Sequence, residues 1–209
     1  MLETRSATVN DLSQIVSIHG SAFPGFFLTR LGPAFLHELY SGFLTDPDHT
    51  GTIILACEDE EILGFAAGTS APETFFRNLR TRRWFFFLLK AIPGLLASPG
   101  LVFRKLWSAM RYRGDTAEEL PGGALLSSLA VSPRAQKKGV GRVLVQRFCE
   151  LSEQSRREYV YVITDKEENR AIIEFYARHG FVAHAVLTKQ NKRQMVRLVK
   201  TLTDNSTAG

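Results

Sequence analysis

The sequence predicts one domain of the α/β (α+β) class, with helices flanking a central sheet. Short apolar runs rich in β-branched residues alternate along the chain with stretches whose apolar residues recur at helical spacing. The length of 209 residues, with 44% hydrophobic and 22% charged residues, suits a single domain with a full hydrophobic core. A turn with glycines at 139 and 141 joins one such strand to a helix and indicates a binding site.

The first half of the chain is predicted to form two helices between strands. Asn10 and Asp11 are residue types that commonly begin a helix, and Pro33 suits the first turn of another. The expected elements are a strand at 4–8, a helix to about Ala22, a helix from Pro33 to Phe43, and a hairpin of strands at 52–58 and 61–70.

The second half is predicted to alternate strands and helices. Gly180 is a natural helix stop. The expected elements are a strand at 124–131, a helix at 139–155, a strand at 159–164, a helix at 169–179, and strands near 182–189 and 193–200. The domain is therefore expected to span residues 1–203, and residues 204–209 are predicted to be a disordered tail.

Between the two halves, residues 71–121 form a basic and aromatic insertion. Residues 73–113 carry nine Lys or Arg against a single acidic residue, so their net charge is +8 while that of the whole chain is +5. Apolar runs starting at Trp84 and Leu101 predict two short helices, separated by Pro-Gly pairs. Three interpretations stay open: packing on the core, peripheral contact with an anionic membrane through 73–113, and a cationic lid over an anionic substrate.

Two other interpretations of this segment are disfavoured. Lys90, two prolines and two glycines interrupt the apolar stretch at 84–103, which argues against a membrane-spanning helix. The aromatic residues form apolar runs and do not alternate with basic residues, which argues against a nucleic-acid partner.

The cysteines and the N-terminus indicate a cytoplasmic protein. Cys57 and Cys149 are too few for a disulfide framework, and both fall in predicted elements, where we expect reduced core thiols. The first residues do not show the basic and apolar regions of a secretory signal. We expect a cytoplasmic location, with the inner membrane surface as the alternative if the basic segment docks there.

The turn at 136–142 has the features of a pyrophosphate cradle. It opens a helix, whose first N–H groups lack intrahelical partners and whose dipole favours an anion, and its glycines let N–H groups converge. It is neither a Walker loop nor a dinucleotide fingerprint, because Leu144 stands where the latter needs a third small residue. The basic side chains around it are Arg134, Lys137, Lys138 and Arg142.

Two motifs resemble those of a known family. The run Gln136-Lys-Lys-Gly-Val-Gly141 closely resembles the coenzyme A loop of the GNAT N-acetyltransferases, Gln/Arg-x-x-Gly-x-Gly/Ala. Residues Asn169 to Phe181 resemble the family's second motif, Asn-x-x-Ala-x-x-x-Tyr-x-x-x-Gly-Phe. The resemblance implies a mixed, mostly antiparallel sheet that splays between the strands at 124–131 and 159–164, with acetyl-CoA in the split. The insertion at 71–121 is longer than the connection common in the family.

The resemblance also implies roles for individual residues. The loop would bind the pyrophosphate of acetyl-CoA, and an N–H of Leu129 or Ala130 would stabilise the developing oxyanion. Tyr176 would protonate the departing sulfur, the alternative being a core aromatic residue, and Asn169 would contact the cofactor or cap its helix. The implied contacts with acetyl-CoA are Leu129, Ala130, Val131, Gln136, Lys137, Lys138, Gly139, Val140, Gly141, Arg142, Asn169 and Tyr176.

The acceptor side is less well defined by the sequence. In the family, the segment between the first two helices borders the acceptor, and here it would suit a partly apolar, partly anionic molecule such as an amino sugar linked to a nucleotide or lipid. Its candidate substrate-binding residues are Phe26, Phe27, Thr29 and Arg30. Many family members carry an acid where this chain has Ser127 and Ser128, so the general base is open. The candidates for it are His19, His37, Glu38 and Glu58.

The sequence therefore predicts an N-acetyltransferase that moves an acetyl group from acetyl-CoA to a primary amine of a small molecule by direct attack in a ternary complex. No metal and no covalent enzyme intermediate are expected, and neither cysteine has a plausible nucleophile setting. Two alternatives stay open: an O-acyl or longer-acyl transferase on the same scaffold, and a membrane-associated coenzyme A-binding module without turnover. The acceptor, the acyl chain length and the oligomeric state, including a homodimer, are left open.

Overall fold

A seven-stranded sheet organises the protein in the computed structural model, which describes residues 1–90, 121–167, 169–188 and 193–202. The strand order is β1-β2-β3-β4-β5-β7-β6, and every neighbouring pair is antiparallel except β4 and β5. The strands are β1 (Leu2–Ser6), β2 (Gly51–Glu58), β3 (Glu61–Thr69), β4 (Ala124–Val131), β5 (Tyr159–Asp165), β6 (Val182–Thr188) and β7 (Gln194–Thr201). The predicted mixed, mostly antiparallel sheet is confirmed.

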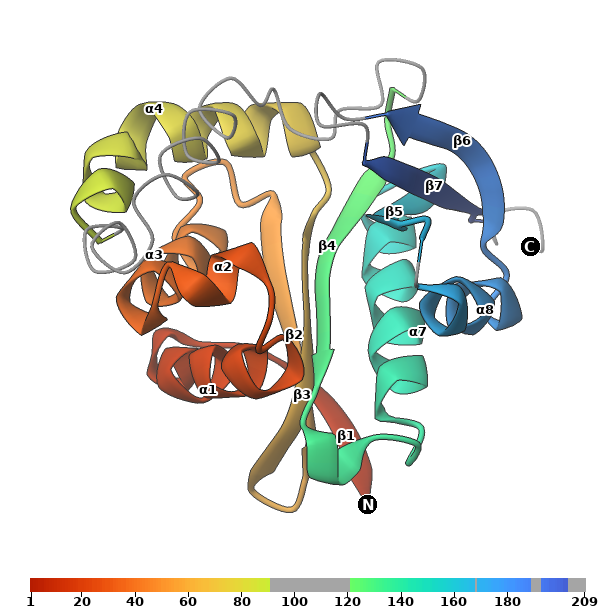
Figure 1. The fold of residues 1–209 in the computed structure, drawn as a ribbon, viewed down its shortest axis with the longest axis horizontal. Helices are drawn as coiled ribbons and strands as arrows, with labels where there is room; N and C mark the ends of the chain where they lie inside the picture. Colours follow the sequence, from red (N-terminus) through yellow and green to blue (C-terminus); the bar gives the residue numbers. More distant parts are fainter. Residues whose placement is uncertain (91–120, 168, 189–192, 203–209) are drawn as a thin grey trace.

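Helices cover both faces of this sheet (Figure 1). One face carries α1, α2, α3 and α4, and the other carries α7 and α8. The α-helices are α1 (Leu12–Ala22), α2 (Phe27–Arg30), α3 (Pro33–Leu44), α4 (Pro72–Lys90), α7 (Val140–Gln154) and α8 (Arg170–Arg178). Two 3-10 turns, η1 (Val9–Asp11) and η2 (Pro133–Ala135), precede α1 and α7.

Each face of the sheet has its own hydrophobic core. Successive side chains of a strand point to opposite faces, so Ile54 packs towards α7 whereas Leu55 packs towards α1 and α3. Strand β3 is buried from Ile62 onwards because helices cover it on both sides. Burying one large apolar side chain stabilises the fold by roughly 1.5–3 kcal/mol, so both helical layers are held firmly against β4, where the motif residues lie.

Strand β1 lies two residues earlier in the chain than predicted, at Leu2–Ser6. Strand β1 ends at Ser6 because η1 begins soon after it, where the backbone N–H and the hydroxyl of its N-cap residue Thr8 both donate to the buried carboxylate of Asp11. Asp11 also pairs with Arg5. Helix α1 begins at Leu12, directly after the predicted start at Asn10 and Asp11, and ends at Ala22 as predicted. The segment at 23–30, between the first two predicted helices, contains the short helix α2.

The described part of the insertion forms one helix of 19 residues, α4, where the sequence predicts a short helix beginning at Trp84. The helix starts earlier because Phe75, which is 1% exposed, and Leu79 pack against the core on the α1–α3 face. The second predicted helix and the tail at 204–209 lie outside the described residues. Within the described parts of the chain, no helix combines the length and the apolarity that crossing a membrane requires.

Candidate active site

Strands β4 and β5 separate along their length. They are parallel neighbours, but only Ala124 with Val160 and Leu125 with Tyr161 are in register, while β4 continues to Val131. Among the residues that the structure describes, the edge of β4 that faces β5 is therefore unpaired after Leu125. Such an edge offers free backbone N–H and C=O groups to an extended ligand. This separation is the split that the resemblance implies.

The hydrogen bonding of β4 shows which residues face the open edge. The N–H of Ser132 donates to the carbonyl of Leu63 on the β3 side at 2.8 Å. Because alternate residues of a strand direct their backbone groups to the same side, Ala130 also faces β3, while Leu129 and Val131 face the split. Of the two predicted oxyanion donors, this geometry favours Leu129, because the N–H of Ala130 is directed to β3.

A bulge precedes these residues in β4. Ala67 of β3 pairs with Ser128 and Gly68 pairs with Leu126, so Ser127 is an extra residue in β4. A bulge redirects the side chains beside it. Ser127 is exposed, whereas Ser128 is half-buried and, like Ala130 two residues later, lies on the face covered by α1 and α3.

The loop before α7 has the backbone of an anion cradle. Lys137 and Gly139 both have positive φ, 64° and 82°, and Gly139 is the N-cap residue of α7. Such turns direct successive N–H groups to one point, beside the unpaired N–H groups of the first helical turn. A Cβ at Gly139 would meet nothing within 4 Å, so this position needs glycine for its φ and not for space. The loop therefore leaves room for a bound anion.

Some side chains around the loop are exposed to solvent, and others contact neighbouring elements. Gln136, Lys137, Lys138 and Arg142 are exposed, and Val140 is buried and anchors the helix start. Arg134, which the sequence places among the surrounding cations, forms an ion pair with Glu61. Gly141 has a different role from Gly139, because a Cβ there would lie 3.3 Å from the ring of Phe175, so glycine lets α8 approach α7.

Helix α8 brings the second motif into the core on the same face. Tyr176 is 7% exposed and packs between Phe175 and Phe181, with ring centroids 5.1 and 5.2 Å from its own. Burial raises the pKa of Tyr176 well above its ordinary value, so the phenol stays protonated at neutral pH, as a proton donor must. Asn169 stands at the N-cap of α8 without a side-chain cap bond, and its amide donates instead to the hydroxyl of Thr164 on β5.

The four predicted substrate-binding residues differ in accessibility. Phe26 is 53% exposed and Arg30 is exposed, so both can meet a ligand. Phe27 packs against Leu31 and Phe35. The hydroxyl of Thr29 donates to the carbonyl of Phe23 at 2.7 Å, so it closes the turn before α2.

The four candidates for a general base also differ. His37 and Glu58 are exposed, and Glu38 pairs with Arg83 of α4. His19 alone of the four is buried, and its Nδ1 lies 2.6 Å from the hydroxyl of Tyr40. Sequence reasoning missed Tyr40, because residues 19 and 40 lie on different helices and no local spacing relates them.

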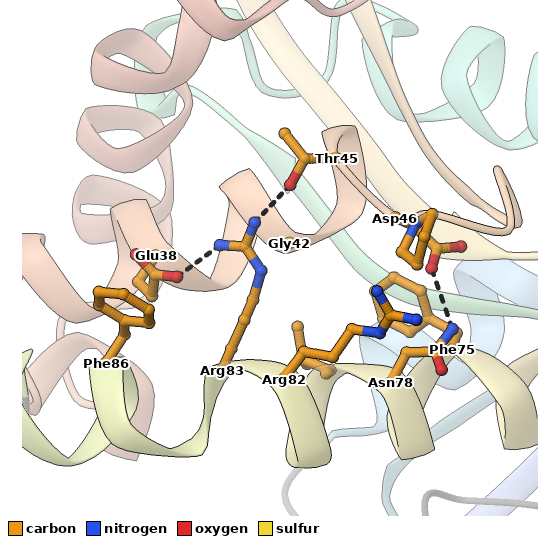
Figure 2. Close-up of a pocket in the computed structure, with 11 residues that line it drawn as sticks. Glu38, Gly42, Thr45, Asp46, Phe75, Asn78, Arg82, Arg83 and Phe86 are labelled. Carbon is orange, nitrogen blue, oxygen red and sulfur yellow. Dashed lines mark hydrogen bonds and ion pairs between the residues drawn. The ribbon is translucent and has the colours of Figure 1, made fainter.

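A separate cavity of about 440 Å³ lies between α3 and α4 (Figure 2). Arg83 reaches from α4 to Glu38 and Thr45, and Asn78 reaches to Asp46. These bonds hold α4 against α3 and against the turn that follows α3. None of the residues that the motifs implicate lines this cavity. In the described residues, no group of three or more His, Cys, Asp or Glu could hold a metal ion.

Comparisons with known proteins agree with this geometry. A family model described as "Acetyltransferase (GNAT) domain" matches residues 107–183, a range that includes β4, the loop, α7, β5 and α8. Residues 107–183, which are less than half of the chain, therefore match a GNAT acetyltransferase domain. The family uses acetyl-CoA as its acetyl donor. A search of the curated proteins found no significant match.

Solved structures show the same fold at low sequence identity. The ribosomal-protein-S18-alanine N-acetyltransferase of Escherichia coli has a TM-score of 0.60 and 13% identity, covering 100% of this chain and 97% of that chain. A chimera of the Vibrio cholerae spermidine N-acetyltransferase SpeG and hSSAT has a TM-score of 0.62 and 14% identity, over 96% and 95%. PaiA N-acetyltransferase of Thermoplasma acidophilum, solved in complex with coenzyme A, has a TM-score of 0.59 and 12% identity, over 97% and 99%.

Proposed function

We propose that this acetyltransferase transfers the acetyl group of acetyl-CoA to a primary amine of a small molecule by direct attack in a ternary complex. The observation that carries the proposal is the unpaired edge of β4, which leads from the split to the positive-φ loop that opens α7. A thioester held along such an edge is rigidly oriented, which removes much of the entropic cost of reaction.

The residues fit the parts of the donor as follows. The N–H groups of the loop and of the first turn of α7 would bind the pyrophosphate, with Lys138 and Arg142 adding cationic charge. Val131 and Leu129 would bond the pantetheine arm, and the N–H of Leu129 would stabilise the oxyanion. Tyr176 would donate a proton to the leaving sulfur. These assignments rest on the directions of the backbone groups and on the burial of Tyr176.

We further propose that the acceptor is partly apolar and partly anionic, as an amino sugar linked to a phosphate-bearing group would be. Phe26, at the N-cap of the short helix α2, has an exposed ring, and Arg30, the last residue of α2, has an exposed guanidinium group. Two proteins of similar fold are named for other acceptors, one for a ribosomal protein and one for spermidine. A screen of acceptors should therefore include cationic molecules and peptides as well as anionic ones.

The donor site is tested by thermal unfolding with and without acetyl-CoA, on the wild type and on two variants of one residue. Gly139→Asp places a carboxylate in the open space at the loop, where it repels a pyrophosphate. Gly139→Asn has nearly the same shape, tolerates positive φ and carries no charge, so it is the matched control. A ligand at 100 times its dissociation constant stabilises a protein by about 2.7 kcal/mol.

We expect acetyl-CoA to raise the Tm of the wild type and of Gly139→Asn by several degrees, and that of Gly139→Asp hardly at all. An equal shift in both variants would contradict the position of the pyrophosphate. No shift in the well-folded wild type would contradict the donor assignment altogether.

Contact with a membrane stays a prediction. Trp84, Phe85 and Phe86 are each about half exposed on α4, at 54%, 52% and 51%. Residues 91–113, the rest of the basic segment, lie outside the described residues. The cytoplasmic location and a homodimer likewise remain predictions from the sequence.

A further inference from the structure

Helix α4 presents a group of large apolar side chains to solvent. Of the ten such side chains that are exposed in the described parts of the chain, four lie within the six residues from Trp84 to Leu89. Trp84 is 54% exposed, Phe85 52% and Leu89 44%. Single exposed apolar residues are ordinary on a protein surface, whereas a contiguous group of them indicates a surface that meets a partner.

The opposite side of the same helix is held against the fold. Phe87 packs on Phe35 of α3, with ring centroids 5.1 Å apart, and Phe75 is fully enclosed in the core. Arg83 adds an ion pair with Glu38 of α3. Because these contacts fix the rotation of α4 about its own axis, the exposed apolar side chains cannot turn inwards without breaking them.

Basic side chains border the apolar ones along α4. The helix carries five Lys or Arg and a single acidic residue, and that residue lies in its first turn, roughly 16 Å along the axis from Trp84. Residues seven apart lie on nearly the same side of a helix, so Arg77 lines up with Trp84 and Arg82 lines up with Leu89. Lys90 follows at the end of the helix, and all three cations are exposed. We call these side chains together the α4 surface, which consists of Trp84, Phe85, Leu89, Arg77, Arg82 and Lys90.

The chemistry of the α4 surface is complementary to an anionic membrane. Aromatic side chains partition into the boundary between lipid headgroups and acyl chains. Each Lys or Arg beside them attracts acidic headgroups and strengthens binding by about fivefold. Figure 1 shows α4 at the periphery of the molecule, beyond α3. A fluid lipid surface can meet a projecting helix without a matching groove, and it supplies negative charge wherever a cation lies.

We propose that α4 docks on the surface of a membrane that contains acidic phospholipids. The apolar residues of the α4 surface enter the boundary with the acyl chains, and its basic residues contact the phosphate groups. With five cations in 19 residues, the helix lies along the membrane surface and does not cross it. Phe87 of α4 shares an apolar cluster with Phe27 and Leu28 of α2, so docking brings the candidate acceptor helix close to the lipid.

The first test is flotation of the full-length protein with two kinds of vesicle, phosphatidylcholine alone and a mixture of phosphatidylcholine and phosphatidylglycerol. We expect the protein to float with the mixed vesicles and not with phosphatidylcholine alone, and to be released as the salt concentration rises. No flotation with the mixed vesicles overturns the proposal. Equal flotation with both kinds contradicts a role for the cations and overturns it as well.

Two triple variants separate the apolar and the basic parts of the α4 surface. Replacing its three apolar residues with Ser should weaken binding on the order of 100-fold. Replacing its three basic residues with Gln should weaken binding on the order of 100-fold at low salt and much less at high salt. The variants are Trp84→Ser with Phe85→Ser and Leu89→Ser, and Arg77→Gln with Arg82→Gln and Lys90→Gln.

Matched controls change the same number of exposed residues across the sheet. One replaces apolar residues of α8 and β6 that are 42%, 67% and 50% exposed, and the other replaces exposed cations on α8 and after β5. Both should bind within about twofold of the wild type, with an unchanged Tm. If the controls lose binding as the α4 variants do, or if the α4 variants keep it, the contact lies elsewhere and the proposal is wrong. The controls are Ile172→Ser with Val182→Ser and Val186→Ser, and Lys166→Gln with Arg170→Gln and Arg178→Gln.

The fluorescence of Trp84 tests whether the apolar residues enter the lipid. The chain has a second tryptophan, Trp107, so the measurement uses Trp107→Phe. Lipids brominated on their acyl chains should quench Trp84 in the mixed vesicles, because an interfacial helix buries its apolar face by about 5–10 Å. Binding without quenching would show that charge alone holds the protein, and it would contradict the docking of the apolar residues.

Self-association is the competing use of the same apolar side chains. Sedimentation without vesicles measures it, and a dimer that the apolar triple variant dissociates, in a protein that does not float, would assign the α4 surface to a second copy and overturn the proposal. None of these measurements uses acetyl-CoA or an acceptor. A failure of the proposed function therefore leaves the membrane proposal intact, and the reverse also holds.

Discussion

The two sides of the open β4 edge are constructed by different means. On the donor side, residues 136–142 use backbone N–H groups and the start of α7, and their side chains are mostly exposed. On the face where we propose that the acceptor binds, α1, α3 and α4 use side chains far apart in the chain, such as His19 with Tyr40 and Glu38 with Arg83.

The difference predicts where each side tolerates substitution. A backbone cradle depends on φ and on open space, so it accepts changes of side chain except at the glycines. A site made of side chains depends on the presence of each partner, because removing one leaves the other buried and unsatisfied. The four predictions below test this contrast, from the largest expected effect to the smallest.

Tyr176→Phe should lower kcat by about 100-fold or more, because the leaving thiolate then lacks its proton donor. The ring and its packing against Phe175 and Phe181 remain, so the stabilisation by acetyl-CoA should persist. Steady-state kinetics of thiol release and thermal unfolding measure the two quantities. An unchanged kcat would show that Tyr176 is a core aromatic residue and not the proton donor.

The stability of the protein should fall in mild acid because of His19. Burial lowers its pKa from 6.5 to about 4, so between these values the unfolded chain binds a proton that the folded protein does not. The contribution of neutral His19 to the free energy of unfolding is therefore fully present above pH 6.5. It is lost as the pH falls towards 4, which lowers the stability by about 3 kcal/mol. Urea unfolding from pH 7 to 5 measures the slope, and His19→Asn should flatten it. Equal slopes in the two proteins would show that His19 is not responsible.

Asp46→Ala should destabilise the protein by about 2 kcal/mol, a Tm decrease of roughly 4–8 °C. Asp46 is 5% exposed and accepts bonds from the N–H and hydroxyl of Thr50, from the N–H of Gly51 and from Asn78 of α4. Asp48→Ala is the control, because Asp48 is exposed and bonds to Asn78 at the surface, and it should change stability by less than about 0.5 kcal/mol. Similar losses in both variants would refute a special role for the buried carboxylate.

Lys138→Ala and Arg142→Ala should each raise the KM for acetyl-CoA only a few-fold, with kcat unchanged. Both side chains are exposed, so solvent and salt screen their attraction for a pyrophosphate, worth about 1 kcal/mol or less. The effect should shrink further in high salt. A loss as large as that expected for Gly139→Asp would show that side chains, and not the backbone, hold the donor.

The donor half of the site could be predicted from the sequence because its parts are neighbours in the chain. Strand β4 was predicted with its observed bounds, and Gly139 lies at the predicted helix start with the positive φ that its residue type allows. The sequence pattern predicted the wrong bounds where contacts between distant parts of the chain set them. For example, α4 begins at Pro72 because Phe75 and Leu79 pack against the core. Arg134 was expected at the anion site, but its ion pair with Glu61 depends on the neighbouring strand.

The sequence by itself determined the class of fold, the resemblance to the GNAT family and the residues of the loop, because glycine conformations and strand or helix periodicity act over short stretches of chain. Only the tertiary structure decided which N–H groups of β4 face the split, since that depends on the register with β3. It alone also joined His19 and Tyr40, which two different helices bring together. Long-range packing fixes such contacts through the surfaces that the elements bury against one another, and no spacing along the chain encodes them.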